Sequence, residues 1–140
     1  MNLKQISVFV ENKPGAIFAP CNVLAEAGIN LSAITLADTA DFGILRFITK
    51  ETERAAEVLR ENHFAVNIAD VLAVRIEDTP GALAKVLKIL EDESLNLLYM
   101  YAAVSTGNPI MIFRFNNTEQ AFGKLSAAGC TIVDEEKFFA

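Results

Sequence analysis

Two stretches of the sequence decide the fold: ENKPGAI at residues 11–17 and EDTPGAL at residues 77–83. Pro80 follows Pro14 at an offset of 66 in residue number, close to half of the 140-residue chain. In both places an alternating apolar run leads into the stretch, and a helical pattern follows it. Each stretch therefore predicts a turn that joins a strand to a helix. Because a helix N-terminus presents free backbone N–H groups, which can bind a carboxylate or a phosphate, we expect the functional site here.

The first half of the chain predicts two helices and four strands in the order βαββαβ. In chain order these are a strand over 3–11, a helix ending near Gly28, strands over 29–37 and 42–49 joined by a turn at 38–41, a helix over 52–62 and a strand from Phe64. Pro20 indicates either an irregular first turn in the first helix or a helix that starts a residue or two late. Thr52, followed by Glu53, predicts the N-cap of the second helix.

The second half repeats this pattern at the same offset of 66, with apolar, turn and polar positions in register. One local slip is expected, because Arg46-Phe47 matches Arg114-Phe115 at an offset of 68, and the hairpin turn at 105–109 accounts for it. We interpret the chain as a tandem duplication, with one domain at 1–69 and another at 70–140. The β-type run over 64–76 is long for one strand, and we expect it to bend near Ala69-Asp70.

Composition excludes several classes of function. The net charge is −6, and the 12 Lys and Arg residues are scattered, which argues against a nucleic-acid partner. No apolar run reaches the length of a membrane span, and we expect no signal peptide, because the N-terminal residues open into a strand pattern. Cys21 and Cys130 lack metal-ligand spacing and lie in apolar contexts, which favours buried, reduced thiols and a cytoplasmic location.

Residues 95–104 read LNLLYMYAAV, which is apolar or aromatic on both faces of a strand. One face can pack against the helices, and the other needs a cover. A homodimer or a contact between domains would provide it, and a deep central strand is the alternative. The aromatic residues at 99–101 favour a ligand with an aromatic, imidazole or branched side chain over an acidic one.

The doubled motif resembles the ACT domain, the small amino-acid-sensing regulatory module attached to many biosynthetic enzymes. The residues that carry the resemblance are the Pro-Gly-Ala-Leu segment at 80–83, its counterpart at 14–17, and Asn-Leu at 30–31 and 96–97. The resemblance covers nearly the whole chain as two ACT repeats without a catalytic domain. It implies an α+β fold, a ferredoxin-like βαββαβ sandwich duplicated in tandem, with ligand sites between ACT domains.

The resemblance also implies which residues contact the ligand. The first loop supplies Asn12, Lys13, Pro14, Gly15, Ala16 and Ile17 with Asn30 nearby, and the second supplies Asp78, Thr79, Pro80, Gly81, Ala82 and Leu83 with Asn96. Amides at 15–17 or 81–83 suit the carboxylate of an amino acid, and the Asn and Asp side chains suit its ammonium. The alternative is that Pro-Gly merely turns the chain. Two departures from the family pattern are Ser94, where the first repeat has Gly28, and Lys13.

Catalytic interpretations find little support. His63 is the only histidine, so no histidine-based triad or metal site can be built around it, and a surface or capping role is expected. The acidic run at 134–136 indicates a solvated chain end. Neither loop has the Arg that an acylphosphatase-like enzyme needs to hold phosphate. We expect no cofactor and no metal.

These observations predict a cytoplasmic, non-catalytic sensor that binds a free amino acid between ACT domains and forms a homodimer. A biosynthetic enzyme or a transport system would sense the binding. The alternative function is a protein-interaction or assembly module with a vestigial ligand loop.

Overall fold

The computed structural model describes residues 3–39 and 41–140. Ala40, in the first expected hairpin turn, lies outside the described residues. The contacts divide the chain into two compact units. The first unit is Lys4–Ala69, and the second unit is Asp70–Ala140 together with Leu3.

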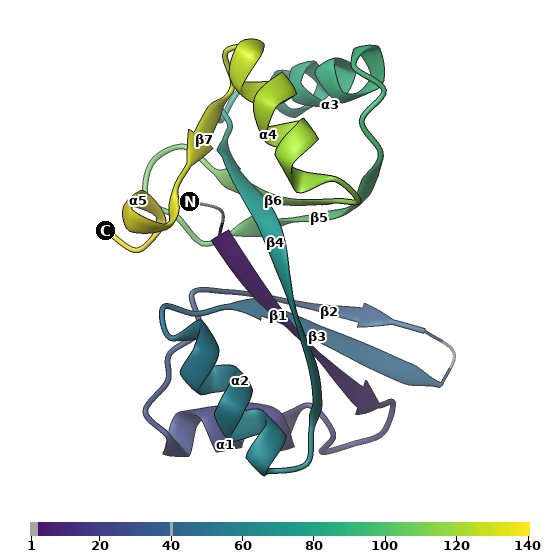
Figure 1. Ribbon diagram of the computed structural model, residues 1–140, viewed down its shortest axis with the longest axis vertical. Coiled ribbons are helices and arrows are strands. Elements are labelled where there is room, and N and C mark those ends of the chain that lie inside the picture. The colour runs from purple at the N-terminus through teal and green to yellow at the C-terminus, as the bar shows by residue number, and fades with distance from the viewer. Residues whose placement is uncertain (1–2, 40) are drawn as a thin grey trace. The chain divides into compact units, whose positions relative to one another are not determined.

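The first unit has two helices packed on one face of a sheet with strand order β2-β3-β1-β4 (Figure 1). Its elements are β1 (Leu3–Glu11), α1 (Phe18–Glu26), β2 (Ala33–Asp38), β3 (Phe42–Ile48), α2 (Thr52–Glu61) and the first part of β4 (Ala65–Arg75). The two expected hairpin strands pair antiparallel, and β3 also pairs antiparallel with β1. β2 begins at Ala33, four residues later than the sequence pattern indicates.

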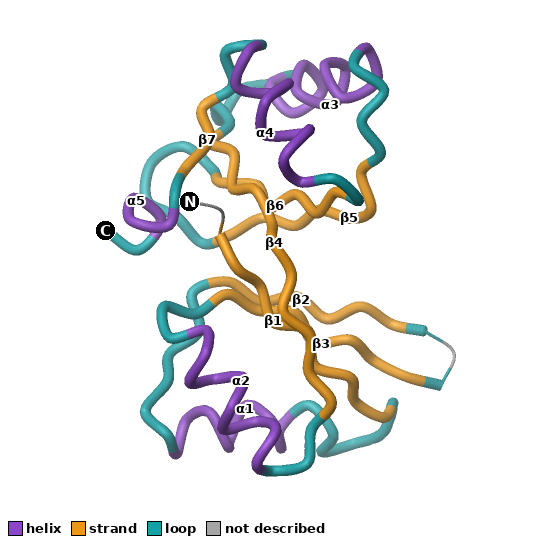
Figure 2. Tube along the Cα trace, in the orientation of Figure 1, coloured by secondary structure: helices purple, strands orange, loops and turns teal. Residues whose placement is uncertain are grey.

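The second unit repeats the arrangement, with strand order β5-β6-β4-β7 (Figure 2). Its elements are the rest of β4, α3 (Ala82–Asp92), β5 (Leu97–Ala103), β6 (Ile110–Phe115), α4 (Thr118–Ala127), β7 (Thr131–Val133) and a short α5 (Glu135–Phe138). The chain therefore forms the predicted ferredoxin-like α+β sandwich twice. β4 is one continuous strand of 11 residues, and it contributes residues to both units.

The strand registers relate the two repeats by a constant offset of 66 in residue number. Ile6 lies opposite Phe47 in the first unit, and their counterparts at this offset, Leu72 and Phe113, lie opposite each other in the second. In the same way, Leu36 pairs with Leu45, as Ala102 pairs with Met111. The expected slip to 68 at Arg46-Phe47 is therefore wrong. Arg46 corresponds to Ile112. Arg46-Phe47 and Arg114-Phe115 have the same residue types, but they do not occupy equivalent positions in the two sheets.

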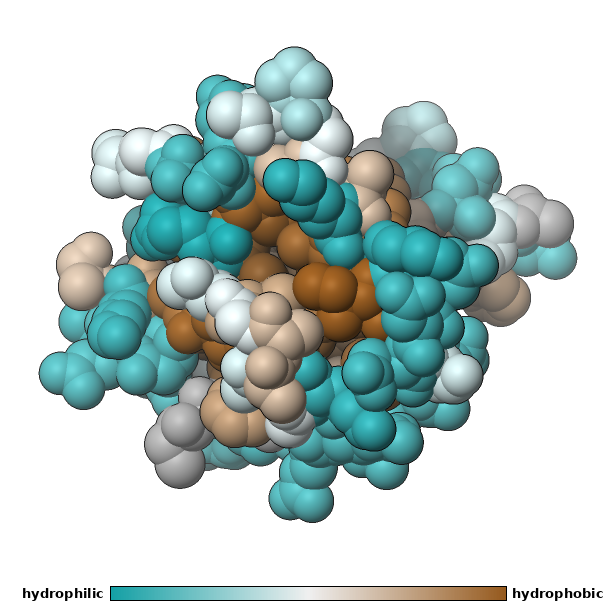
Figure 3. Space-filling view, turned by 90° about the horizontal axis from the view of Figure 1, so that it is seen from above, coloured by the Kyte–Doolittle hydropathy of each residue, from teal (hydrophilic) through white to brown (hydrophobic). Residues whose placement is uncertain are grey.

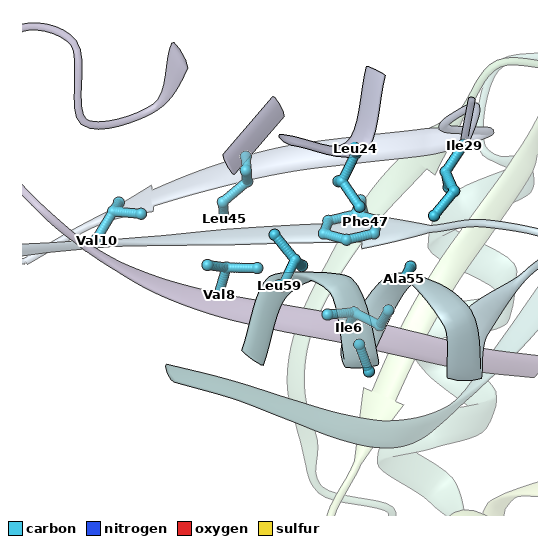
Figure 4. Packing of buried hydrophobic residues seen from close by; sticks show 10 residues of the cluster. Ile6, Val8, Val10, Leu24, Ile29, Leu45, Phe47, Ala55 and Leu59 are labelled. Carbon is cyan, nitrogen blue, oxygen red and sulfur yellow. The ribbon is translucent and has the colours of Figure 1, made fainter. Parts of the chain in front are cut away.

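The core of the first unit forms where alternate residues of the sheet meet the helices. Figure 4 shows Ile6, Val8 and Val10 of β1 beside Leu45 and Phe47 of β3, and helix residues lie against them. The second unit has an equivalent cluster that includes Leu72, Val74, Ile76, Phe113, Phe115 and Leu125. This packing is the result that the alternating apolar pattern predicts, because successive side chains of a strand point to opposite faces.

Helices α1 to α4 end in the same way. The residue after each C-cap has positive φ: Gly28 (74°), His63 (68°), Ser94 (55°) and Gly129 (84°). At each end, this residue and the next donate their N–H groups to carbonyls of the last turn, as Ser94 N does to Glu91 O at 3.1 Å and Leu95 N to Leu90 O at 2.9 Å. These bonds form a Schellman motif, which satisfies otherwise unpaired helix carbonyls. The expected capping role of the exposed His63 is confirmed, since it stands where the other repeat has Gly129.

The helix starts differ from the sequence prediction. Thr52 is the first helical residue and not the N-cap, and its hydroxyl donates to Thr49 O at 3.3 Å. In the second repeat the cap is Asn117, whose side chain accepts a hydrogen bond from Gln120 N at 3.1 Å. α1 begins at Phe18, two residues later than its counterpart α3, so Pro20 falls in the first turn, where its missing N–H costs nothing. The expected late start is confirmed.

Candidate functional site

The two Pro-Gly stretches form turns of the same geometry. Gly15 and Gly81 both have φ of 86°, and each follows a proline. Ala16 N donates to Lys13 O at 3.2 Å, and Ala82 N donates to Thr79 O at 3.2 Å. Pro at the second position and a left-handed Gly at the third are the residues that a type II turn requires. The turn chemistry is therefore encoded twice in the sequence and formed twice in the structure.

In each loop, the hydrogen bond of the turn uses one of the amides that we expected to bind a ligand. Ala16 and Ala82 are the donors within the turns. Within residues 3–39 and 41–140, the N–H groups of Ile17 and Leu83 have no hydrogen-bond partner. A Cβ built on the glycine of either turn would have no heavy atom within 4 Å, so the space in front of both turns is open. Each loop thus keeps free amide donors beside accessible space.

A pocket of about 110 Å³ lies at the first loop. Its lining residues come from the end of β1, the turn, the residue that leads into α1 and the facing ends of β2 and β3: Glu11, Asn12, Lys13, Ile17, Leu36, Ala37, Asp38 and Gly43. Charges of both signs are present. Lys13 Nζ lies 3.0 Å from Glu11 Oε2, with both side chains exposed, and Asn12 Nδ2 donates to Asp38 Oδ1 at 3.5 Å. The site combines a cation, carboxylates and an apolar wall.

Five residues of this pocket were absent from the sequence prediction: Glu11 at the end of β1, and four residues of the hairpin, Leu36, Ala37, Asp38 and Gly43. The hairpin residues reach the loop through strand pairing, because Glu11 lies opposite Phe42, and Gly43 lies opposite Asp38. The signal that could have found them is the hairpin itself. A βαββ order places the end of β2 at the same end of the sheet as the end of β1.

The second loop borders a different cavity, of about 310 Å³. Loop residues Glu77, Thr79 and Ala82 line one side of it, and α3 and the connection from α4 to β7 line the rest. Its apolar floor includes Val74 and Val86. Figure 3, which views the second unit from above, shows hydrophobic residues gathered in a hollow ringed by hydrophilic ones. None of the residues 99–101 lines either loop pocket.

The structure does not bring Asn30 to its own loop, nor Asn96 to the second. Asn30 precedes the start of β2, whereas the first loop lies at the end where β2 finishes at Asp38. Asn96 likewise precedes the start of β5. The second loop lies at the opposite end of the sheet, where β5 finishes at Ala103. The carbonyl of Asn30 accepts a hydrogen bond from the Thr49 hydroxyl at 2.8 Å. The prediction that Asn30 lies near the first loop is therefore wrong within one unit.

A further cavity, of about 420 Å³, lies away from both turns, between α4, β7 and β4. Phe122, Ser126 and Asp134 are among its lining residues. Asp134 has a structural role there, because its Oδ1 accepts a hydrogen bond from Lys137 N at 2.8 Å and caps α5. The acidic run at 134–136 thus begins a helix, where carboxylates are favoured by the helix dipole.

The two cysteine thiols lack the lowered pKa of a catalytic nucleophile. Cys21 and Cys130 are free thiols. The sequence predicts that both are buried, but both are only half-buried. Burial raises the pKa of both thiols, which disfavours the nucleophilic thiolate. In the described part of the chain, His, Cys, Asp and Glu form no cluster that could hold a metal ion. No helix among residues 3–39 and 41–140 is long and apolar enough to cross a membrane.

Comparison with known proteins identifies the family. A family model described as an ACT domain pair matches residues 1–139. The crystal structure of protein BT0572 from Bacteroides thetaiotaomicron is 38% identical with a TM-score of 0.92, over 99% of this chain and 96% of that chain. The ligand-free regulatory subunit of aspartate kinase from Thermus thermophilus shares the fold, at 19% identity and a TM-score of 0.63, over 91% of this chain and 92% of that one. A comparison with curated proteins finds no match. The chain therefore belongs to the family of ACT domain pairs.

Proposed function

We propose that this protein is a non-catalytic regulator that binds a free amino acid at a Pro-Gly loop, where one ACT domain meets a neighbouring ACT domain in a homodimer. The observation that carries the proposal is the pocket at the first loop, which holds Lys13, Asp38 and an apolar wall beside free amides. A cation and carboxylates that line one pocket with a small apolar surface match the chemistry of a zwitterion with a side chain.

Each part of an amino acid has a partner in this pocket. The ligand carboxylate suits the Lys13 ammonium and the free N–H of Ile17, at the positive end of α1. The ligand ammonium suits the carboxylates of Asp38 and Glu11. The side chain suits the surface of Ile17 and Leu36. A ligand of about ten heavy atoms binding with about −7 kcal/mol would have micromolar affinity, which suits the sensing of metabolite levels.

A second ACT domain would complete the site by covering its open side. Leu36 is 53% exposed and Ile34 is 49% exposed on β2, the edge strand beside the pocket. On β5, an edge strand of the second unit, Leu98 is 50% exposed, although Tyr101 and Ala103 are buried. An edge strand with exposed apolar side chains is favoured by pairing or covering. These features support the proposal of a homodimer.

Binding would be read by a partner, and we infer a biosynthetic enzyme or a transport system in the cytoplasm. The regulatory subunit of aspartate kinase from Thermus thermophilus supports this reasoning, because a chain of comparable length there is named as a regulatory subunit. Partner recognition would follow from a change in the loop or in the dimer contact when the ligand neutralises the charges of the pocket.

The alternative is an assembly module in which the Pro-Gly loops only turn the chain. The exposed apolar side chains on β2 and β5 favour it, since they would serve an assembly contact with or without a ligand.

Thermal unfolding in the presence of each of the twenty amino acids separates the two functions. A sensor has a higher melting temperature with one amino acid or a few related ones, because a ligand that binds only the folded state stabilises it. If none of the twenty shifts the melting temperature and titration calorimetry detects no heat, the sensor function is wrong and the assembly function is favoured.

A further inference from the structure

We propose that the first repeat alone carries the ligand site, and that the ligand is a free amino acid with a small, uncharged side chain. This inference rests on the proposed function, and it specifies which loop acts and what it selects. The constant offset of 66 between the repeats makes the comparison possible, because it gives every pocket residue of the first repeat one counterpart in the second.

The two loops differ first in charge. The counterpart of Lys13 is Thr79, and the counterpart of Asp38 is Val104, which is 92% exposed. The second repeat therefore has no cation at the turn position and no carboxylate at the strand position that correspond to Lys13 and Asp38. The second turn has the acidic residues Glu77 and Asp78, but no lysine stands at the turn position that corresponds to Lys13. Arg75, Lys85 and Glu77 line the separate cavity on the other flank of the second turn. A cation in the turn together with a carboxylate at the end of the hairpin strand occurs in the first repeat only.

The loops differ also in shape. Gly43 lies in the wall of the first pocket, and its counterpart is Pro109. A Cβ added at Gly43 would lie 3.2 Å from Val10 Cγ2 and 3.4 Å from Leu36 Cδ1, so the space at this position is already filled to contact. Pro109 adds a ring there, and its carbonyl accepts a hydrogen bond from Ile76 N at 2.8 Å, which fixes it to the strand. The apolar wall is also reduced, because Ala102 replaces Leu36.

The larger cavity at the second loop is not the counterpart of the first pocket. The first pocket opens toward the ends of β2 and β3. The second cavity lies on the opposite flank of its turn, against α3 and residues 128–131. No residue of β5 or β6, the strands that correspond to β2 and β3, is among its lining residues.

The dimensions of the first pocket indicate the ligand class. The part of the site that one chain supplies has a volume of about 110 Å³, well below the about 300 to 1,000 Å³ of sites for drug-sized ligands. The wall that a ligand side chain would meet is Ile17, Leu36 and Ala37, without a charged group dedicated to it. The ion pair between Lys13 and Glu11 is exposed, and exposed ion pairs contribute little to stability. Lys13 can therefore leave Glu11 and bind a ligand at a small cost in free energy. Glycine, alanine, serine, threonine and valine fit these limits.

Titration calorimetry of the full chain with each of the twenty amino acids tests the inference through stoichiometry and selectivity. We expect one ligand per chain and binding confined to small, uncharged amino acids. Two ligands per chain, or a preference for a charged or aromatic amino acid, would overturn the inference and leave the proposed function intact. No binding by any of the twenty would instead remove the proposed function itself.

A matched pair of variants identifies the loop. Asp38→Asn removes the carboxylate of the first pocket but keeps an oxygen for the bond from Asn12, and Asp78→Asn makes the same change in the second loop. We expect about tenfold weaker binding or more for Asp38→Asn, because it removes a charged partner of the ligand ammonium. Asp78→Asn should bind within about twofold of the unchanged protein. The reverse pattern, or equal loss in both variants, would contradict the assignment to the first repeat.

A second pair tests the shape argument without a change of charge. Gly43→Ala narrows the pocket, whereas Gly123→Ala adds a methyl group in α4, where a Cβ would have no heavy atom within 4 Å. We expect Gly43→Ala to weaken the binding of alanine, serine, threonine and valine more than that of glycine, and Gly123→Ala to leave all affinities unchanged. Unchanged affinities in a folded Gly43→Ala variant would place the ligand elsewhere.

Discussion

Asn12 donates a long hydrogen bond, 3.5 Å, from Nδ2 to Oδ1 of Asp38, and so connects the turn after β1 to the last residue of β2. The counterparts of these residues in the second repeat are Asp78 and Val104, which cannot form such a bond. The turn of the first repeat is therefore tied to the edge strand that forms the wall of its pocket. Asp38 and Ile17, whose N–H group is free, line the same pocket.

The first prediction concerns the two turn glycines. Gly15→Val and Gly81→Val each force a β-branched residue to φ near 86°, and each should cost about 1–3 kcal/mol of unfolding free energy. Because the turns have the same geometry, the two losses should be similar, as measured by denaturant unfolding. Only Gly15→Val should also abolish the melting-temperature shift produced by the amino acid. A shift that survives in Gly15→Val and disappears in Gly81→Val would assign the site to the second loop.

The second prediction concerns the end of α3. Ser94 has φ of 55°, in the conformation that Gly28 provides in the first repeat. Ser94→Gly should raise the unfolding free energy by about 0.5–1 kcal/mol, because glycine adopts the left-handed conformation without the steric cost of a Cβ. Ser126→Gly, inside α4, is the control, and it should lower stability by a similar amount. Loss of stability in both variants would mean that the left-handed Ser94 is not strained.

The third prediction uses two core leucines at equivalent positions of the repeats. Leu59 of α2 and Leu125 of α4 are both fully buried. Leu59→Ala and Leu125→Ala should each lower the unfolding free energy by about 2–5 kcal/mol, through lost apolar burial and the cavity that remains. Leu98→Ala, at a half-exposed position on β5, should cost under about 1 kcal/mol. Losses under about 1 kcal/mol for either buried leucine would contradict the equivalence of the two cores.

The fourth prediction concerns pH. Burial raises the pKa of the Cys21 and Cys130 thiols, whereas an unfolded chain has thiols with an ordinary pKa of about 8.5. The unfolded state therefore loses protons first as the pH rises, so the thiols lower stability only above about pH 8.5 and have no effect below it. Native protein at about pH 8.5 should react with iodoacetamide more slowly than denatured protein. Equal rates would mean that the thiols are as exposed and as acidic as free cysteine.

Much of the fold was predictable because its signals are local. The alternation of Ile6, Val8 and Val10 predicts a strand with one buried face, and the structure buries all three in one core. The turn at Pro14-Gly15 was predictable because only certain residues suit a left-handed third position. The helix caps were not predictable in this way. The N-cap of α2 is Glu51, without a side-chain hydrogen bond, and the N-cap of α4 is Asn117 and not Thr118, because the backbone path decides which residue stands at the cap.

The site was only partly predictable, because half of it is made by strand register. The loop residues could be read from the sequence, but Leu36, Asp38 and Gly43 join them only when β2 and β3 pair in their observed register. The same register separates Asn30 from the loop. The expected slip of two positions, based on the likeness of Arg46-Phe47 to Arg114-Phe115, assigned the wrong counterparts to the residues of the return strand β3.

The shared spacing of the repeats, apart from one register shift between Leu97 and Tyr99 in β5, has an evolutionary consequence. Since the copying event, divergence across the paired strands has proceeded by substitution, without a net gain or loss of residues. Under the proposal that the first repeat alone binds the ligand, the second repeat records which substitutions the fold accepts without that function. Placing Lys, Asp and Gly at positions 79, 104 and 109 of the second repeat would test whether these three residues are enough to create ligand binding there.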